Sequence, residues 1–143
     1  MKIVDLNVLL YAVNRDSAHH ERVRNWWEKT LCDSEPVGLA WVVLLGFLRM
    51  VTNPRVFVQP LTPAEALDRV DVWLAHPTTR IVTETEEQWR ILRQLLEEAG
   101  TLGNLTTDAH LASLAIAYGA TLVSCDGDFA RFARLRWENP AAT

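Results

Sequence analysis

Two carboxylates separated by one glycine stand near the end of the chain, at Asp126 and Asp128. At this spacing their negative charges repel each other, and a divalent cation bound between them removes the repulsion. Ligands that offer only oxygen atoms suit Mg²⁺ or Mn²⁺. Such an ion activates water and stabilises the charge on a phosphate group under attack. The pair therefore raises the question of whether other acids join it.

Two further acids stand where a sheet would bring them to the same place. Asp5 directly follows the short apolar run Lys2–Val4, and Asp126 is close behind a similar run, Thr121–Val123. Parallel sheets bind ligands at the carboxyl ends of their strands. If the two strands are neighbours, the acids that follow them share one edge of the sheet. Asp108, which stands at the start of a helical segment, can point to the same edge.

Each acid also has a purely structural interpretation. Asp108 can be a first-turn residue that interacts favourably with the helix dipole. Asp126 and Asp128 can belong to a polar turn. Asp5 is harder to explain in this way, because it follows a strand that looks buried. The combination is therefore more informative than any single acid.

The rest of the chain alternates apolar segments of strand length with amphipathic segments of helix length. Strands are expected at Lys2–Val4, Val37–Ala40, Arg80–Val82 and Thr121–Val123. Helices are expected at Asn7–Val13, Ser17–Leu31, Trp41–Val51, Thr62–Ala75, Thr83–Gly100 and from Thr106 or Thr107 to Gly119, with a short helical turn near Phe129. This alternation predicts an α/β fold with a parallel sheet covered on both faces.

Two of the expected helix starts have the spacing of a capping box. In the first, Thr62 is the cap, Pro63 takes the first helical position and Glu65 follows three residues after the cap. In the second, Thr83 and Glu86 have the same spacing. The sequence therefore predicts that the later helix begins directly after Thr83.

The composition limits the class of protein. A chain of 143 residues with 49% hydrophobic content suits a single globular domain, residues 1–143. The net charge of −4 argues against a strongly basic surface for nucleic acid. The cationic residues are nearly all arginines, since the only lysines are Lys2 and Lys29. Arginine binds two phosphate oxygens at once, although a genome rich in arginine codons would give the same bias.

The two cysteines and the first residues indicate a cytoplasmic protein. Cys32 and Cys125 are too few for a disulfide framework, so we expect reduced thiols. The apolar start is interrupted by Asp5 and Asn7. We therefore expect neither a signal peptide nor a membrane helix there.

Two other folds with an aspartate after the first strand fit the sequence poorly. A haloacid-dehalogenase-type phosphatase requires a second Asp two residues after the first, but Asn7 stands there. That fold and the response-regulator receiver both require a later lysine, and none follows Lys29. Both alternatives are therefore rejected.

The chain resembles a PIN domain and, more narrowly, a VapC-type ribonuclease toxin of a bacterial toxin–antitoxin pair. The resemblance covers nearly the whole chain and rests on the segments "VDLNVLLYA", "FLRMVTNPRVF", "GNLTTDAHLASLAIAYGATLVSCDGDFARF" and "LRWENP". It implies a three-layer α/β/α sandwich around a short parallel sheet of four or five strands. It also implies Mg²⁺- or Mn²⁺-dependent cleavage of RNA phosphodiester bonds by water.

The resemblance also assigns roles to particular residues. The catalytic acids fall on Asp5, Asp108, Asp126 and Asp128. The first three would hold the ion or its waters, and Asp128 would complete the negative rim. Polar residues that support the site fall on Asn7, Thr107 and Ser124. The implied partners are an antitoxin of the VapB type and a second copy of the chain in a homodimer.

One position departs from the family pattern. PIN domains usually carry a further Glu on the helix after the second strand, and Gly46 occupies the matching position here. Glycine inside a helix costs about 1 kcal/mol relative to alanine. Three explanations are open: the site works without this acid, another group such as Glu21 replaces it, or activity is reduced or lost. We expect that restoring the acid with Gly46→Glu would tighten Mn²⁺ binding.

The family resemblance also suggests a substrate, and the departure at Gly46 leaves a second candidate function open. Candidates for holding RNA phosphates are Arg49 and Arg131, with Arg15 and Arg55 as further possibilities. The resemblance favours tRNA or ribosomal RNA, cut in exposed single-stranded loops. The competing hypothesis is a catalytically impaired PIN-like module that binds RNA or a partner. Tryptophans on the amphipathic helices are expected mostly in the core, with some lining an apolar groove for the antitoxin.

Overall fold

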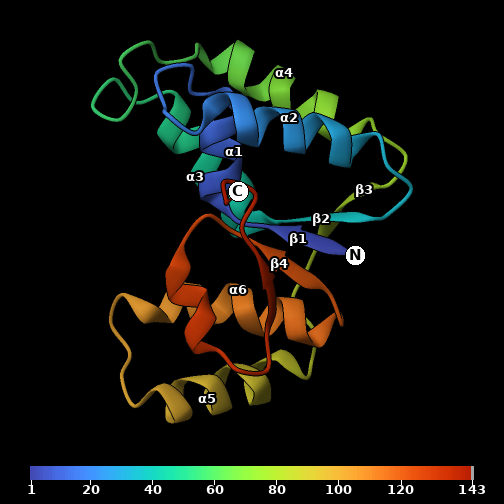
Figure 1. Cartoon of the computed structure of the whole chain (residues 1–143), viewed down its shortest axis with the longest axis vertical. Coiled ribbons are helices and arrows are strands. Elements are labelled where there is room, and N and C mark those ends of the chain that lie inside the picture. The colour runs from blue at the N-terminus through green and yellow to red at the C-terminus, as the bar shows by residue number, and fades with distance from the viewer. Residues whose placement is uncertain (143) are drawn as a thin grey trace.

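A sheet of five parallel strands runs through the middle of the molecule, with helices on both faces (Figure 1). The computed structural model describes residues 1–142. The strands are β1 (Lys2–Val4), β2 (Val37–Ala40), β3 (Thr79–Val82), β4 (Thr121–Val123) and β5 (Arg136–Glu138). Their spatial order is β3-β2-β1-β4-β5. The predicted α/β class and parallel sheet are confirmed.

Two groups of helices cover the sheet. The helices are α1 (Leu6–Val13), α2 (His20–Leu31), α3 (Trp41–Val51), α4 (Pro63–Leu74), α5 (Gln88–Ala99) and α6 (Leu105–Ala117), with a 3₁₀ turn η1 (Gly127–Arg131) after β4. Helices α1 to α4 lie above the sheet in Figure 1, and α5 and α6 lie below it. The arrangement is the three-layer sandwich that the resemblance implied.

The apolar runs form strands because both faces of the sheet are covered. Ile3, Val4, Leu122 and Val123 have no exposed surface, and neither has Leu39 of β2. Strands buried on both sides read as continuous apolar runs rather than as alternating patterns. This is why the sequence located β1, β2 and β4 at the residues where the structure has them.

The strand order reverses between β1 and β4. From β1 the chain adds β2 and then β3 on one side, and after α5 and α6 it returns to place β4 on the other side of β1. Val4 pairs with Val123, and the backbone N–H of Asp5 donates to the carbonyl oxygen of Val123 at 2.9 Å. Open α/β sheets bind ligands at such a switch point, beyond the carboxyl ends of the strands. The expected neighbourhood of the first and fourth strands is confirmed.

Helix α4 begins with the predicted capping box. The backbone N–H of Glu65 donates to the Thr62 hydroxyl at 3.2 Å. In return the backbone N–H of Thr62 donates to the Glu65 carboxylate at 3.0 Å. Pro63 takes the first helical position, where its missing N–H leaves no bond unmade.

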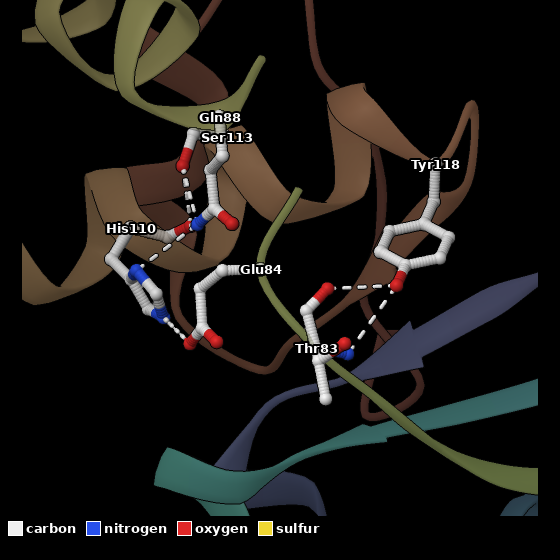
Figure 2. A network of polar contacts seen from close by, with 6 residues as sticks. All are labelled: Thr83, Glu84, Gln88, His110, Ser113 and Tyr118. Atoms are coloured by element: carbon white, nitrogen blue, oxygen red, sulfur yellow. Dashed lines mark hydrogen bonds and ion pairs between the residues drawn. The ribbon is translucent and has the colours of Figure 1, made fainter. Parts of the chain in front are cut away.

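The second predicted capping box is wrong. Helix α5 begins at Gln88, and Glu87 is its cap without a side-chain hydrogen bond. The Tyr118 hydroxyl, from the end of α6, accepts from the backbone N–H of Thr83 at 3.3 Å and donates to its carbonyl oxygen at 2.7 Å (Figure 2). Thr83 is therefore held by a residue far away in the sequence instead of starting a helix.

Some other boundaries also differ from expectation. Helix α2 begins at His20 rather than Ser17, and α6 begins at Leu105 with Asn104 as its cap. Gly119, with a φ of 62°, follows the end of α6 as predicted. Strand β5 was not located from the sequence, because three residues with charged ends give no apolar run. It lies at the edge of the sheet, where β4 is its one neighbouring strand among residues 1–142.

The structure also bears on two smaller predictions. Within residues 1–142, no helix has both the length and the apolar character needed to span a membrane. Cys32 is exposed and Cys125 is half-buried, and both are free thiols.

Candidate active site

Three carboxylates meet beyond the carboxyl end of β4. Asp108, Asp126 and Asp128 each offer one oxygen, and these oxygens all lie within 4.8 Å of one another. Asp108 lies in the first turn of α6, Asp126 caps η1 and Asp128 lies in the first turn of η1. The backbone N–H of Asp128 donates to Oδ1 of Asp126 at 2.9 Å, which fixes the tight turn between them. Helix α6 and the 3₁₀ turn η1 thus bring three acids together.

Asp5 lies beside this cluster at the start of α1. Its side chain is the N-cap of the helix, and Oδ1 accepts from the backbone N–H of Leu6 at 2.7 Å. Its other oxygen, Oδ2, accepts from the Ser124 hydroxyl at 2.7 Å. Asp5 is only 9% exposed. Both oxygens therefore have defined donors, and the carboxylate has one fixed orientation.

A polar network around Ser124 joins the ends of β1 and β4. The Asn7 side-chain N–H₂ donates to Oγ of Ser124 at 3.1 Å, and its carbonyl oxygen accepts from the backbone N–H of Cys125 at 3.0 Å. The backbone N–H of Asp126 also donates to Oγ of Ser124, at 3.1 Å. The hydroxyl thus gives its proton to Asp5 and accepts two hydrogen bonds, which uses its full capacity. The structure thus places Asn7 and Ser124 in hydrogen-bond contact with Asp5, and their role as supports of a metal site stays a prediction.

The surroundings raise the pKa values of two of these acids, Asp108 and Asp5. Burial raises the pKa of Asp108 to about 6, with further contributions from the charges of Asp126, Asp5 and Asp128. Burial also raises the pKa of Asp5, although the hydrogen bonds from Ser124 and Leu6 act in the opposite direction. Within residues 1–142, no Lys, Arg or His side chain forms an ion pair with any of the four. The cluster therefore holds negative charge that the described side chains leave uncompensated.

This arrangement fits a divalent cation. All donor atoms of the cluster are carboxylate oxygens, the type that Mg²⁺ and Mn²⁺ prefer. Clustered acids with raised pKa values are typical of functional sites, and an ion between them would remove the repulsion. The four predicted acids are thus brought to one edge of the sheet by β1, β4 and α6.

The remaining predicted residues lie further from these contacts. Thr107 lies on the exposed first turn of α6, next to Asp108. Arg49 is exposed in the last turn of α3. Arg131 is exposed and lines a cavity of about 230 Å³ between η1 and the end of α5, together with Glu98 and Phe132. Neither arginine forms an ion pair with the acids, so their role in binding RNA stays a prediction.

The space beside Gly46 is occupied by the Leu6 side chain of α1 rather than by an acidic side chain. Gly46 is buried on α3, and a Cβ built there would lie 2.8 Å from Cδ2 of Leu6. The carboxylates that meet at the site come from α6 and η1, with Asp5 beside them. Glu21, considered as a replacement acid, is exposed on α2 and is not among them.

Two supporting residues had no role in the sequence-based prediction. Leu6 donates to Asp5 and fills the space at Gly46. Trp137, on β5, donates its indole N–H to the carbonyl oxygen of Ser124 at 3.0 Å. The segment "LRWENP", which carried part of the resemblance, contains β5. Because β5 pairs with β4, Trp137 lies close enough to bond to Ser124 beside the acids.

The comparisons with known proteins agree with this geometry. The PIN domain family profile matches residues 2–135. The chain is 46% identical to Ribonuclease VapC37 of Mycobacterium tuberculosis over 142 residues, which cover 99% of each protein. It is 44% identical to Ribonuclease VapC43 of the same species over 140 residues, which cover 98% of this chain and 95% of the relative.

A solved structure shows the same fold at lower sequence identity. It is a crystal structure of VapBC2 from Rickettsia felis bound to a DNA fragment from the promoter. The two chains superimpose with a TM-score of 0.71 at 22% identity, over 96% of this chain and 97% of the other. Together with the matched profile and the mycobacterial relatives, the acidic cluster leads to one conclusion: the chain belongs to the PIN-domain family and, within it, to the VapC ribonucleases.

Proposed function

We propose that this chain is a metal-dependent endoribonuclease, the toxin of a type II toxin–antitoxin pair, that hydrolyses phosphodiester bonds of tRNA or ribosomal RNA in the cytoplasm. The observation that carries the proposal is the cluster of Asp108, Asp126 and Asp128, whose carboxylate oxygens lie within 4.8 Å of one another. The cluster occurs in a chain that is 46% identical to Ribonuclease VapC37 over nearly its whole length.

The four acids would have different roles in binding the ion. Asp108 and Asp126 would bind Mg²⁺ or Mn²⁺, Asp5 would bind the ion or its waters, and Asp128 would add charge at the rim. When bound, the ion supplies Lewis acidity that acidifies water and neutralises charge on the phosphate. Ser124 and Asn7 keep the Asp5 carboxylate in one orientation, because the Ser124 hydroxyl donates to Oδ2 and the Asn7 amide lies 3.3 Å from the same oxygen. Thr107 would act at the same rim, next to Asp108.

Exposed arginines would guide the RNA. The guanidinium groups of Arg49 and Arg131 are free to bind two phosphate oxygens each, since neither is engaged in an ion pair within residues 1–142. The substrate would be a single-stranded loop, because splayed bases leave the phosphodiester backbone accessible.

An antitoxin and a second copy complete the proposal. A cavity of about 400 Å³ between α2 and α4 is lined by Trp27, Leu31, Val72 and Trp73, and an apolar segment of the antitoxin would cover it. The VapBC2 structure from Rickettsia felis provides a precedent for a complex of this kind. The homodimer would use the exposed apolar face of α3, where Trp41 is 50% and Leu45 is 60% exposed.

Cleavage of a mixed pool of tRNA and ribosomal RNA tests the proposed activity. The purified chain would be incubated with Mg²⁺, with Mn²⁺ and with EDTA, and an Asp126→Asn protein prepared in the same way would control for contaminating ribonuclease. We expect discrete products that require the metal and are missing with Asp126→Asn. Metal binding without any cleavage would instead favour an impaired module that binds RNA or a partner.

A further inference from the structure

Gly46 and Leu6 form a contact that connects α3 to the start of α1. The three heavy atoms nearest to a Cβ built at Gly46 all belong to the Leu6 side chain: Cδ2 at 2.8 Å, Cδ1 at 3.6 Å and Cγ at 3.7 Å. Within residues 1–142, no side chain from another element comes as close to this position. Since Gly46 is buried, the space that its side chain would need is already occupied by Leu6.

Leu6 is linked directly to a carboxylate of the site. It is the first residue of α1 and follows Asp5, the N-cap of that helix. Its backbone N–H donates to Oδ1 of Asp5 at 2.7 Å. One turn of α1 thus carries both the side chain that lies over Gly46 and the donor that orients the acid. The other oxygen of Asp5 is held from β4, by Ser124.

We infer that Gly46 is a positioning residue for Asp5: the missing side chain leaves the space in which Leu6 lies, and Leu6 in turn fixes the first turn of α1 and the orientation of the Asp5 carboxylate. This inference rests on the proposed metal-dependent function. It assigns to position 46 a packing role that an acid there would abolish, and it explains how the chain departs from the family pattern without leaving a gap beside the site.

The size of the displacement makes an effect on the site reasonable. A Cβ at position 46 would crowd Cδ2, a terminal methyl group of Leu6, which would have to move by roughly 0.6 Å from 2.8 Å to ordinary contact near 3.4 Å. Groups that act in a binding site must be held within about 0.5 Å of their working geometry. If the first turn of α1 moves together with that methyl group, a shift of this size would disturb the donor to Asp5. The competing outcome is a rotation of the Leu6 side chain alone, which would leave Asp5 where it is.

Mn²⁺ affinity, measured by titration calorimetry on the full chain, separates these outcomes. Gly46→Ala adds the methyl group without adding charge, and we expect it to weaken Mn²⁺ binding by about tenfold, the size of effect seen when a support of a metal ligand is lost. Leu6→Ala removes the other half of the contact and should also weaken binding. In the double variant Leu6→Ala/Gly46→Ala, the added methyl group occupies part of the vacated space, so we expect tighter binding than with Leu6→Ala alone.

Gly38→Ala is the matched control. A Cβ at Gly38, on β2, would lie 2.9 Å from Cγ1 of Val82 and 3.1 Å from Cγ1 of Ile3, so the substitution crowds the core to a similar degree without touching Leu6. We expect it to lower the melting temperature and to leave Mn²⁺ affinity unchanged. Weakening by Gly38→Ala equal to that by Gly46→Ala would overturn the inference, because general crowding would then explain both.

The remaining outcomes are also decisive. Equal Mn²⁺ affinity in the natural chain and Gly46→Ala would overturn the inference and leave the proposed function intact. Absence of Mn²⁺ binding by the natural chain would overturn the proposed function, and this inference with it. If Gly46→Ala does not fold, the comparison of Leu6→Ala with the double variant decides. Tighter binding by the double variant supports the inference, and equal or weaker binding refutes it.

Discussion

Asp5 and Asp108 carry their negative charge in different surroundings. For Asp5, burial raises the pKa, but donors from Ser124 and Leu6 stabilise the ionised form and limit the shift. For Asp108, burial and the charges of three neighbouring carboxylates act in the same direction and raise the pKa to about 6. A cation bound nearby would therefore favour the ionised form of Asp108.

Replacing Asp108 by Asn should stabilise the metal-free protein near neutral pH. The folded-state pKa of about 6 lies above the ordinary value of 3.8, so the folded state binds the proton more tightly than the unfolded state does. Stability contributed by the protonated group is therefore present at low pH and is lost as pH rises from near 3.8 through about 6. We expect Asp108→Asn to melt at a higher temperature than the natural chain in EDTA at about pH 7.5, with a smaller difference at about pH 4.5.

The matched control for this prediction is Asp33→Asn, an exposed acid on the loop before β2 that takes no part in the cluster. Its melting temperature should follow that of the natural chain at both pH values. A higher melting temperature for the natural chain than for Asp108→Asn in EDTA would show that the carboxylate is stabilising, contrary to the repulsion described here.

At the scale of the elements, local sequence patterns predicted most of the helices and strands and the position of the acids relative to them. Apolar runs located β1, β2 and β4, and the residues that follow β1 and β4 provide Asp5 and Asp126. What local patterns missed depends on distant partners. Thr83, which was expected to start a helix, is instead bound by Tyr118 from 35 positions away in the sequence.

The contact between Leu6 and Gly46 was missed for the same reason. It joins α1 and α3 across 40 positions of the sequence, and no spacing rule connects two such residues. Strand β5 likewise depends on its pairing with β4 rather than on its own composition. The sequence could therefore indicate the candidate acids, and the fold was needed to show which residues contact them.

The junction of β1 and β4 gives a prediction for Ser124. Ser124→Ala would leave Oδ2 of the buried Asp5 without its hydroxyl donor and the half-buried backbone N–H of Asp126 without that acceptor. Loss of a partner to a buried polar group costs about 1–3 kcal/mol. We expect a decrease of this order in the free energy of unfolding measured in urea, together with weaker Mn²⁺ binding in calorimetry.

Ser113→Ala provides the comparison, because Ser113 is also fully buried and its hydroxyl donates to the carbonyl oxygen of His110 at 2.7 Å (Figure 2). It belongs to the contacts between α5 and α6, where Gln88 lies 3.2 Å from its hydroxyl. This variant should lose stability and keep the Mn²⁺ affinity of the natural chain. Equal Mn²⁺ affinity in Ser124→Ala would mean that the junction of β1 and β4 does not depend on this hydroxyl to hold the acids.

At the scale of the whole molecule, charge is distributed unevenly. The net charge is only −4, yet four acids gather at one edge of the sheet without ion pairs in the described part of the chain. An RNA backbone would approach this edge only when cations reduce the repulsion. In the folded protein the four acids therefore repel one another at the place where the proposed ion would bind. A bound cation would reduce this repulsion.

Metal binding should consequently stabilise the entire fold. A ligand that binds only the folded state at 100 times its dissociation constant adds about 2.7 kcal/mol to the free energy of unfolding. For a chain of this size, that corresponds to an increase in melting temperature of roughly 5–10 °C. We expect an increase of this size when Mn²⁺ replaces EDTA at about pH 7.5, measured by scanning calorimetry, and little or none in Asp126→Asn. An equal increase in Asp126→Asn would place the stabilising Mn²⁺ outside the cluster, whereas no increase in the natural chain would mean that the four acids do not bind the ion at these concentrations.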